Sequence, residues 1–137
     1  MTNSGLAGSY LTKARARLKI LPVLLAERAY SDVLREAQEI VELSLKGMLR
    51  QVGVEPPKWH DVGPLLLEHA TRFPQSPAEL EGLAEISARL RKEREFAFYG
   101  DIDFIPTERY SIEDAERALR DAEAVVAEAG RVIGGSG

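Results

Sequence analysis

The chain contains no cysteine, and this absence excludes several kinds of chemistry. Without thiols there is no disulfide, no thiolate zinc site and no cysteine nucleophile, and a reducing compartment is expected. Histidine is nearly as scarce, because His60 and His69 are the only two, and they are not spaced as metal ligands. We therefore expect the protein to need no metal and no other cofactor.

The chain also has no apolar run of membrane-spanning length, and basic residues are spread through its first thirty positions. This pattern is not that of a signal peptide, so a cytoplasmic protein without membrane contact is expected. The net charge is −4, but the first thirty residues hold five of the 18 basic groups and only Glu27 of the 22 acidic ones. The rest of the chain is therefore acidic, and an acidic surface argues against binding duplex DNA, which requires many phosphates to be neutralised. One small anion pocket is still permitted.

The remaining composition favours one helical domain. At 137 residues and 45% hydrophobic content, the chain suits a single core, and we expect one domain over residues 1–137 with a flexible tail at about 134–137. Apolar residues recur at spacings of three and four, and no segment alternates with a period of two. The sequence therefore predicts an all-α bundle.

Local signals place five helical segments. The first is interrupted at Pro22, which predicts a kink or two shorter helices. Ser31 and Asp61 are candidate N-caps for the second and third, and Ser76 and Ser111 open capping boxes for the last two. The expected helices cover residues 6–28, 32–53, 62–73, 77–99 and 112–133. Charged residues of the first two helices are expected to be solvated or to form surface pairs.

One arginine departs from the segregation of charge in the fourth helix. Arg94 lies near the middle of an apolar arc, whereas Arg89, Lys92 and Glu93 are expected to point outward. The arc comprises Leu80, Leu83, Ser87, Leu90, Ala97 and Phe98. A guanidinium facing a core needs an anionic partner. That partner is either a carboxylate, from Glu39, Glu42 or Asp101, or a phosphate held through two parallel hydrogen bonds.

Other residues could complete such an anion site, and each has a second interpretation. His60 could act as a base or could pack in its loop beside Asp61, and Tyr99 could stack on a nucleobase or belong to the core. The candidate phosphate-binding set is Arg94, Arg91, Tyr99, Asp101, His60 and Lys58.

Three stretches together resemble the small stand-alone HEPN (higher eukaryotes and prokaryotes nucleotide-binding) domain proteins of prokaryotes. They are AYSDVLREAQEIVELSLKGMLRQVGVEPPKWHDVGPLL, LRKEREFAFYGD and FIPTERYSIEDAERAL, and the resemblance runs from about residue 6 to residue 130. It implies an antiparallel four-helix up-and-down bundle with a short extra helix. It also implies a homodimer linked with nucleotide or RNA chemistry, often as the partner of a minimal nucleotidyltransferase.

The resemblance also bears on catalysis. HEPN ribonucleases of toxin–antitoxin and defence systems carry an arginine, matched here by Arg94, followed four to six residues later by a histidine. No histidine follows here, because residues 99 to 101 are Tyr, Gly and Asp. A tyrosine is a poor base near pH 7, since its pKa is about 10. The motif is half present, so no catalytic residue is assigned; a ribonuclease would have to use Arg94 with Tyr99 or His60.

Three hypotheses follow. The first is a module that binds nucleotide or RNA phosphate at Arg94 and acts with a nucleotidyltransferase. The second is a divergent metal-independent ribonuclease. The third is a structural or antitoxin-like partner protein in which an internal carboxylate neutralises Arg94.

Overall fold

The computed structural model describes residues 3–58, 61–98 and 109–134, and side chains within 5–58, 61–94 and 109–134. Its elements are α1 (Asn3–Leu18), α2 (Leu21–Ala26), α3 (Tyr30–Gln51), α4 (Gly63–Glu68), a 3-10 turn (Ala70–Arg72), α5 (Pro77–Phe98) and α7 (Ile112–Val132). No strand occurs among these residues. The predicted all-helical fold is confirmed.

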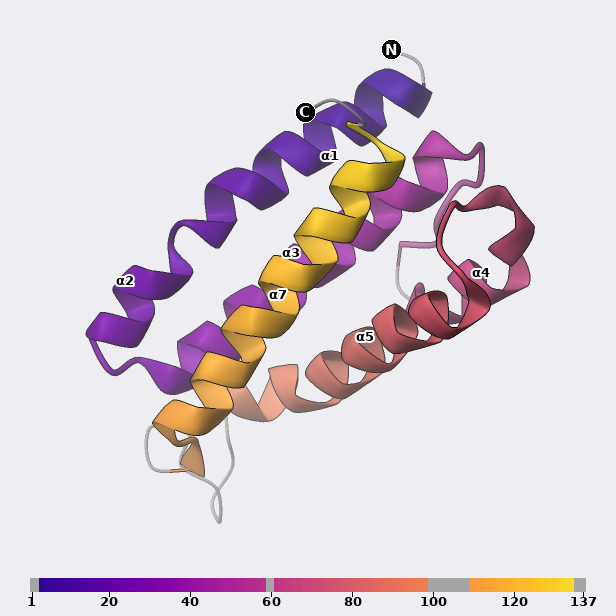
Figure 1. The fold of residues 1–137 in the computed structure, drawn as a ribbon. Coiled ribbons are helices and arrows are strands. Elements are labelled where there is room, and N and C mark those ends of the chain that lie inside the picture. Colours follow the sequence, from indigo (N-terminus) through magenta and orange to yellow (C-terminus); the bar gives the residue numbers. More distant parts are fainter. Residues whose placement is uncertain (1–2, 59–60, 99–108, 135–137) are drawn as a thin grey trace.

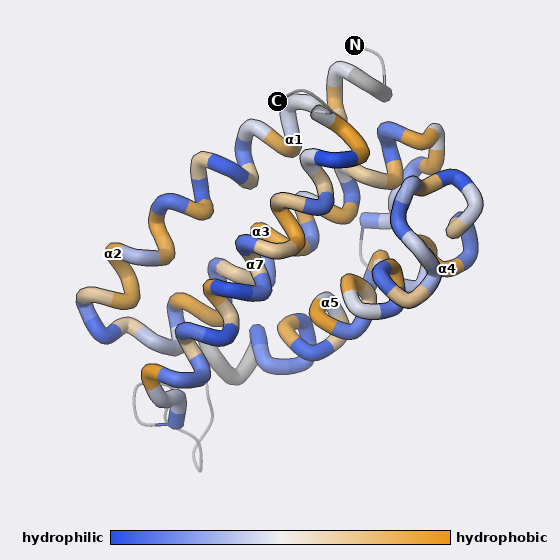
Figure 2. The backbone as a smooth tube through the Cα atoms, viewed as in Figure 1, coloured by the Kyte–Doolittle hydropathy of each residue, from blue (hydrophilic) through white to orange (hydrophobic). Residues whose placement is uncertain are grey.

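Helix α3 is the centre of the bundle. Figure 1 shows α1, α5 and α7 arranged around it, with α4 beside the first half of α5. The core of α3 includes Ile40, Leu45, Met48 and Leu49, all fully buried. Along the long helices hydrophilic and hydrophobic stretches alternate, as expected of helices with one buried side (Figure 2). Helix α5 packs against α3 but makes little close backbone contact with α7.

The predicted break in the first helix is confirmed as two shorter helices. Helix α1 ends at Leu18, and α2 begins at Leu21 with Pro22 in its first turn. Proline fits there because the first N–H groups of a helix have no partner within it. The backbone then turns at Arg28, whose φ of 60° is in the left-handed region, before α3 starts.

The capping predictions divide into two correct and two wrong. Ser76 with Glu79, and Ser111 with Asp114, form reciprocal capping boxes. Ser31, by contrast, is buried inside α3, which begins one residue earlier without a side-chain cap. Asp61 does not cap α4 either: its Oδ1 accepts hydrogen bonds from the backbone N–H of Gly63 and, at 2.7 Å, from the hydroxyl of Ser87.

The hydrogen bond between Ser87 and Asp61 also positions the end of the PPKWHDVG loop. Ser87 lies in the middle of α5, on its predicted apolar arc, and is buried. The hydrogen bond from Ser87 therefore fixes the end of this loop to α5, four residues before Arg91. Lys58, in the same loop, is exposed.

Candidate functional site: a charge cluster on helix α3

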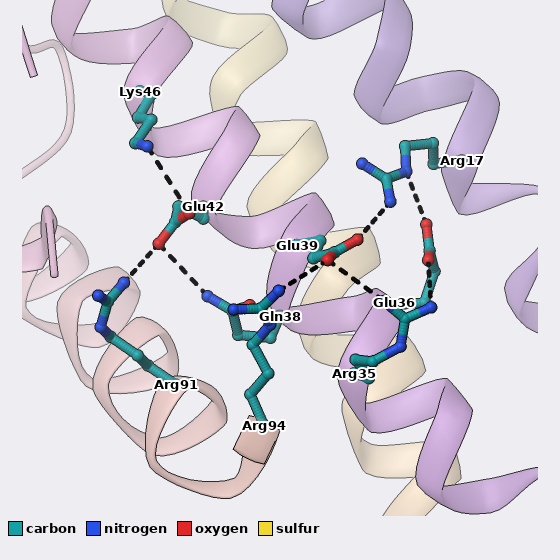
Figure 3. Close-up of polar contacts among 9 residues, drawn as sticks. All are labelled: Arg17, Arg35, Glu36, Gln38, Glu39, Glu42, Lys46, Arg91 and Arg94. Atoms are coloured by element: carbon teal, nitrogen blue, oxygen red, sulfur yellow. Dashed lines mark hydrogen bonds and ion pairs between the residues drawn. The ribbon is translucent and has the colours of Figure 1, made fainter. Parts of the chain in front are cut away.

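Three glutamates on one edge of α3 form ion pairs with five cationic side chains from three helices. Glu36, Glu39 and Glu42 follow one another at intervals of three residues, so they rise along the same side of the helix. Their cationic neighbours are Arg17 from α1, Arg35 and Lys46 from α3, and Arg91 and Arg94 from α5 (Figure 3). We call these eight residues the charge cluster; its formal charge is positive in an acidic protein.

Glu39 is the most heavily shared carboxylate of the cluster. Its Oε1 accepts hydrogen bonds from Arg94 at 3.0 Å and from Arg35 at 3.3 Å, and its Oε2 accepts one from Arg17. Partial burial by itself raises the pKa of the Glu39 carboxyl. The hydrogen bond and charge of Arg17, with help from Arg94 and Arg35, outweigh that effect and hold the pKa below its usual value.

The two ends of the cluster differ in composition. At one end Arg17 also donates from Nε to the buried Glu36 at 2.7 Å, which ties α1 to α3. At the other end Glu42 accepts from Arg91 at 2.6 Å and lies 3.6 Å from the ammonium of Lys46, which ties α5 to α3. The first end joins α1 to α3 and the second joins α5 to α3, and both are partly open to solvent, since Arg17 is 37% and Arg91 is 36% exposed.

Arg94 is not aimed into the core as its place on the apolar arc predicts. Its side chain is 49% exposed and lies at the edge of α3, and Arg91 is 36% exposed beside it. The arc itself is buried through Leu80, Leu83 and Leu90, so the periodicity was correct for most of α5. At Arg91 and Arg94, α5 faces the charged edge of α3 instead of the apolar stripe, and a pattern within one helix cannot reveal this.

Two residues that are expected to point outward link α5 to α7 and to Tyr110, the residue directly before the N-cap of that helix. Arg89 donates to Asp121 at 2.8 Å, and Glu93 accepts from the hydroxyl of Tyr110 at 2.7 Å. The expectation that they point outward is wrong, because α7 and the residues just before it lie on that flank of α5.

Of the predicted phosphate-binding residues, the structure brings Arg91 and Arg94 together on one flank of α5. Lys58 makes no hydrogen bond or ion pair with them within the described residues. His60, Tyr99 and Asp101 lie outside the described residues. Sequence reasoning named Glu39 and Glu42 as candidate partners of Arg94, of which Glu39 is confirmed, but it missed Arg17, which was expected to be solvated.

The part of the chain with described placement contains no group of three His, Asp or Glu side chains that could hold a metal ion. Nor does it contain a helix that is both long and apolar enough to cross a membrane. The charge cluster consists of four arginines, one lysine and three glutamates, and its chemistry is the reversible pairing of cations with anions.

The described residues form an all-helical bundle around the central helix α3, whose one edge carries the charge cluster. The sequence model of the HEPN domain matches residues 7–132, which is nearly the whole chain. The chain belongs to the HEPN domain family. Comparison with curated proteins and with solved structures gave no significant match.

Proposed function

We propose that this HEPN domain binds the phosphate groups of a nucleotide or of RNA through Arg94 and Arg91. The family match supports a nucleotide- or RNA-related module in general, and the observation that carries the finer assignment is the state of Arg94. Its guanidinium is half exposed and, among the described residues, makes one ion pair, at 3.0 Å, with a carboxylate that two other arginines also bind. An incoming phosphate can therefore reach Arg94 and replace a shared partner.

The form of the Arg94–Glu39 pair distinguishes binding from a purely structural role. A structural pair of arginine and carboxylate is best made by two parallel hydrogen bonds away from water. Arg94 has one such bond within the described residues and is open to solvent, where ion pairs contribute about 0–1 kcal/mol. A bidentate phosphate contact is stronger than this pair, so the exchange is favourable.

The protein is further proposed to act as a homodimer and with a separately encoded minimal nucleotidyltransferase. Both parts rest on the HEPN family and not on a contact within this chain. Sedimentation of the purified protein tests the first, with a species of twice the chain mass expected. A nucleotidyltransferase encoded next to this gene, and its co-purification with this protein, would support the second.

Binding is tested with two probes, ATP and a single-stranded RNA oligonucleotide, in EDTA at low salt. We expect Arg94→Gln to weaken binding about tenfold or more, since a hydrogen bond to a charged group is worth about 1.5–3 kcal/mol. Arg91→Gln should weaken it less, because Arg91 is less exposed than Arg94 and is already bound to Glu42 at 2.6 Å. Arg120→Gln on the exposed side of α7 is the charge-matched control and should bind as the wild type does.

The same samples separate binding from cleavage. RNA that stays intact at high protein concentration supports a binding module, whereas cleavage lost in Arg94→Gln would establish a metal-independent ribonuclease. Equal affinity in wild type and Arg94→Gln, or no affinity in either, would overturn the proposed phosphate site.

A further inference from the structure

A cavity of about 180 Å³ lies on the other flank of α5, between α3, α5 and α7. Its floor is apolar and buried, and consists of Leu34 from α3, Leu90 from α5 and Ala118 from α7. Glu93 and Arg94 are adjacent in sequence, yet Glu93 lines this cavity while Arg94 belongs to the charge cluster. The two places are therefore separated by the body of α5.

The acidic groups in the cavity wall already have internal partners. Glu93 accepts the hydrogen bond from the buried Tyr110, and Asp114 accepts one from the backbone N–H of Ser111 in the capping box. Neither carboxylate is therefore left to require a cation from outside. They also fix the walls, because Tyr110 is held to α5 and Asp114 is held at the first turn of α7.

The basic groups of the wall outnumber the acidic ones. Arg89, Arg109 and Arg117 line the cavity together with two carboxylates, which leaves a formal excess of one positive charge. The Nε atom of Arg89 is buried and has no acceptor within the described residues, although its terminal nitrogen binds Asp121. Arg117 makes no hydrogen bond or ion pair with any residue in the described ranges. A buried donor without an acceptor needs a water, an ion or a ligand to complete it.

We propose that this cavity binds a small organic anion, with an apolar body of about one ring and a single carboxylate or phosphate group. A cavity of about 150 Å³ is known to accept benzene, so this one is large enough for a single ring. Leucine and alanine side chains of the floor would pack against the ring, and the guanidiniums would bind the anionic group. This site is independent of the phosphate site proposed at Arg94.

Benzoate and phenyl phosphate are the probes, and inorganic phosphate and neutral benzamide are the controls. In calorimetry or backbone NMR titration of the whole protein, at least one of the two aromatic anions should bind at least five times more tightly than either control. Binding of benzoate alone assigns the carboxylate class, and binding of phenyl phosphate alone assigns the phosphate class.

Variants locate the binding. Arg117→Gln should weaken it about fivefold, and Arg89→Lys, which keeps the charge beside Asp121 but removes the Nε donor, should also weaken it. Arg120→Gln and Arg94→Gln should bind these probes as the wild type does. No binding at millimolar probe, equal binding of inorganic phosphate, or a loss caused by Arg94→Gln but not by Arg117→Gln would overturn the proposal.

Discussion

Replacing Glu39 by glutamine perturbs the charge cluster at its most shared residue. The substitution keeps the shape of the side chain and removes its negative charge. The guanidiniums of Arg17, Arg35 and Arg94 then lose an anionic partner. Glu36 remains beside the first two, and Glu42 still pairs with the other two cationic groups of the cluster. A phosphate site and a structural ion-pair network respond differently to this change.

Stability should fall modestly. Arg17 keeps its 2.7 Å contact with Glu36, so its link between α1 and α3 is weakened and not lost. The hydrogen bonds to the shared carboxylate lie partly in solvent, and we expect a loss of about 1–2 kcal/mol in the free energy of unfolding, at the lower end for charged hydrogen bonds. Urea unfolding measures this loss directly.

Affinity for phosphate should rise in the same variant. At an effective dielectric constant of 20, a unit charge about 4 Å away contributes about 4 kcal/mol, which is an upper bound. Because Arg94 is half exposed, we expect about 1 kcal/mol, or roughly a fivefold tighter complex with ATP and with single-stranded RNA. The rise should shrink at high salt, since exposed charges are screened.

Glu123→Gln on the exposed side of α7 makes the same change in net charge away from the cluster and is the matched control. It should leave stability and affinity within error of the wild type. A Glu39→Gln protein that is folded and less stable, but binds phosphate no better than the control, would refute the idea that Glu39 competes with a ligand for Arg94.

Three further predictions concern the packing and ionisation of the bundle. Gly63→Ala should destabilise the protein by about 1–3 kcal/mol, because an added Cβ would lie 3.1 Å from the backbone Cα of Ala84, and urea unfolding tests this. Gly82→Ala, where a Cβ meets nothing within 4 Å, should instead stabilise α5 by up to about 1 kcal/mol in the same assay; a loss there would contradict the open surface described. Burial, and then the hydrogen bond to Glu93, raise the pKa of Tyr110, so its contribution to stability is full below the usual tyrosine pKa of about 10 and is lost as pH rises above it. Tyr110→Phe should abolish that alkaline loss, as measured by unfolding at increasing pH, and an unchanged pH dependence would contradict the assignment.

Local signals in the sequence predicted the parts of the fold that depend on neighbouring residues. The capping boxes at Ser76 and Ser111 were identified because both members lie within one turn. Pro22 predicted the break between α1 and α2 for a similar reason. Ser31 failed because the backbone turn at Arg28 starts α3 earlier, and nothing in the residue pattern announces that turn.

The candidate site was only half predictable. Periodicity wrongly placed Arg94 on the core side of α5, although Glu39, one of the carboxylates considered as its partner, does bind it. It could not show that Arg17 binds the same carboxylate, because that contact depends on how α1 lies against α3. Nor could it show that Arg89 and Glu93 face α7, since the angular position of a residue on its own helix does not specify the neighbouring helix.

The salt dependence of RNA binding tests the central claim most directly. Each phosphate contact of a single strand contributes about 0.7 to the slope of log K against log salt concentration. If Arg91 and Arg94 each bind one phosphate, the double variant Arg91→Gln/Arg94→Gln should lower the magnitude of that slope by about 1.4 and weaken binding, whereas Arg120→Gln should change neither. A slope and an affinity equal to those of the wild type in the double variant would contradict the account.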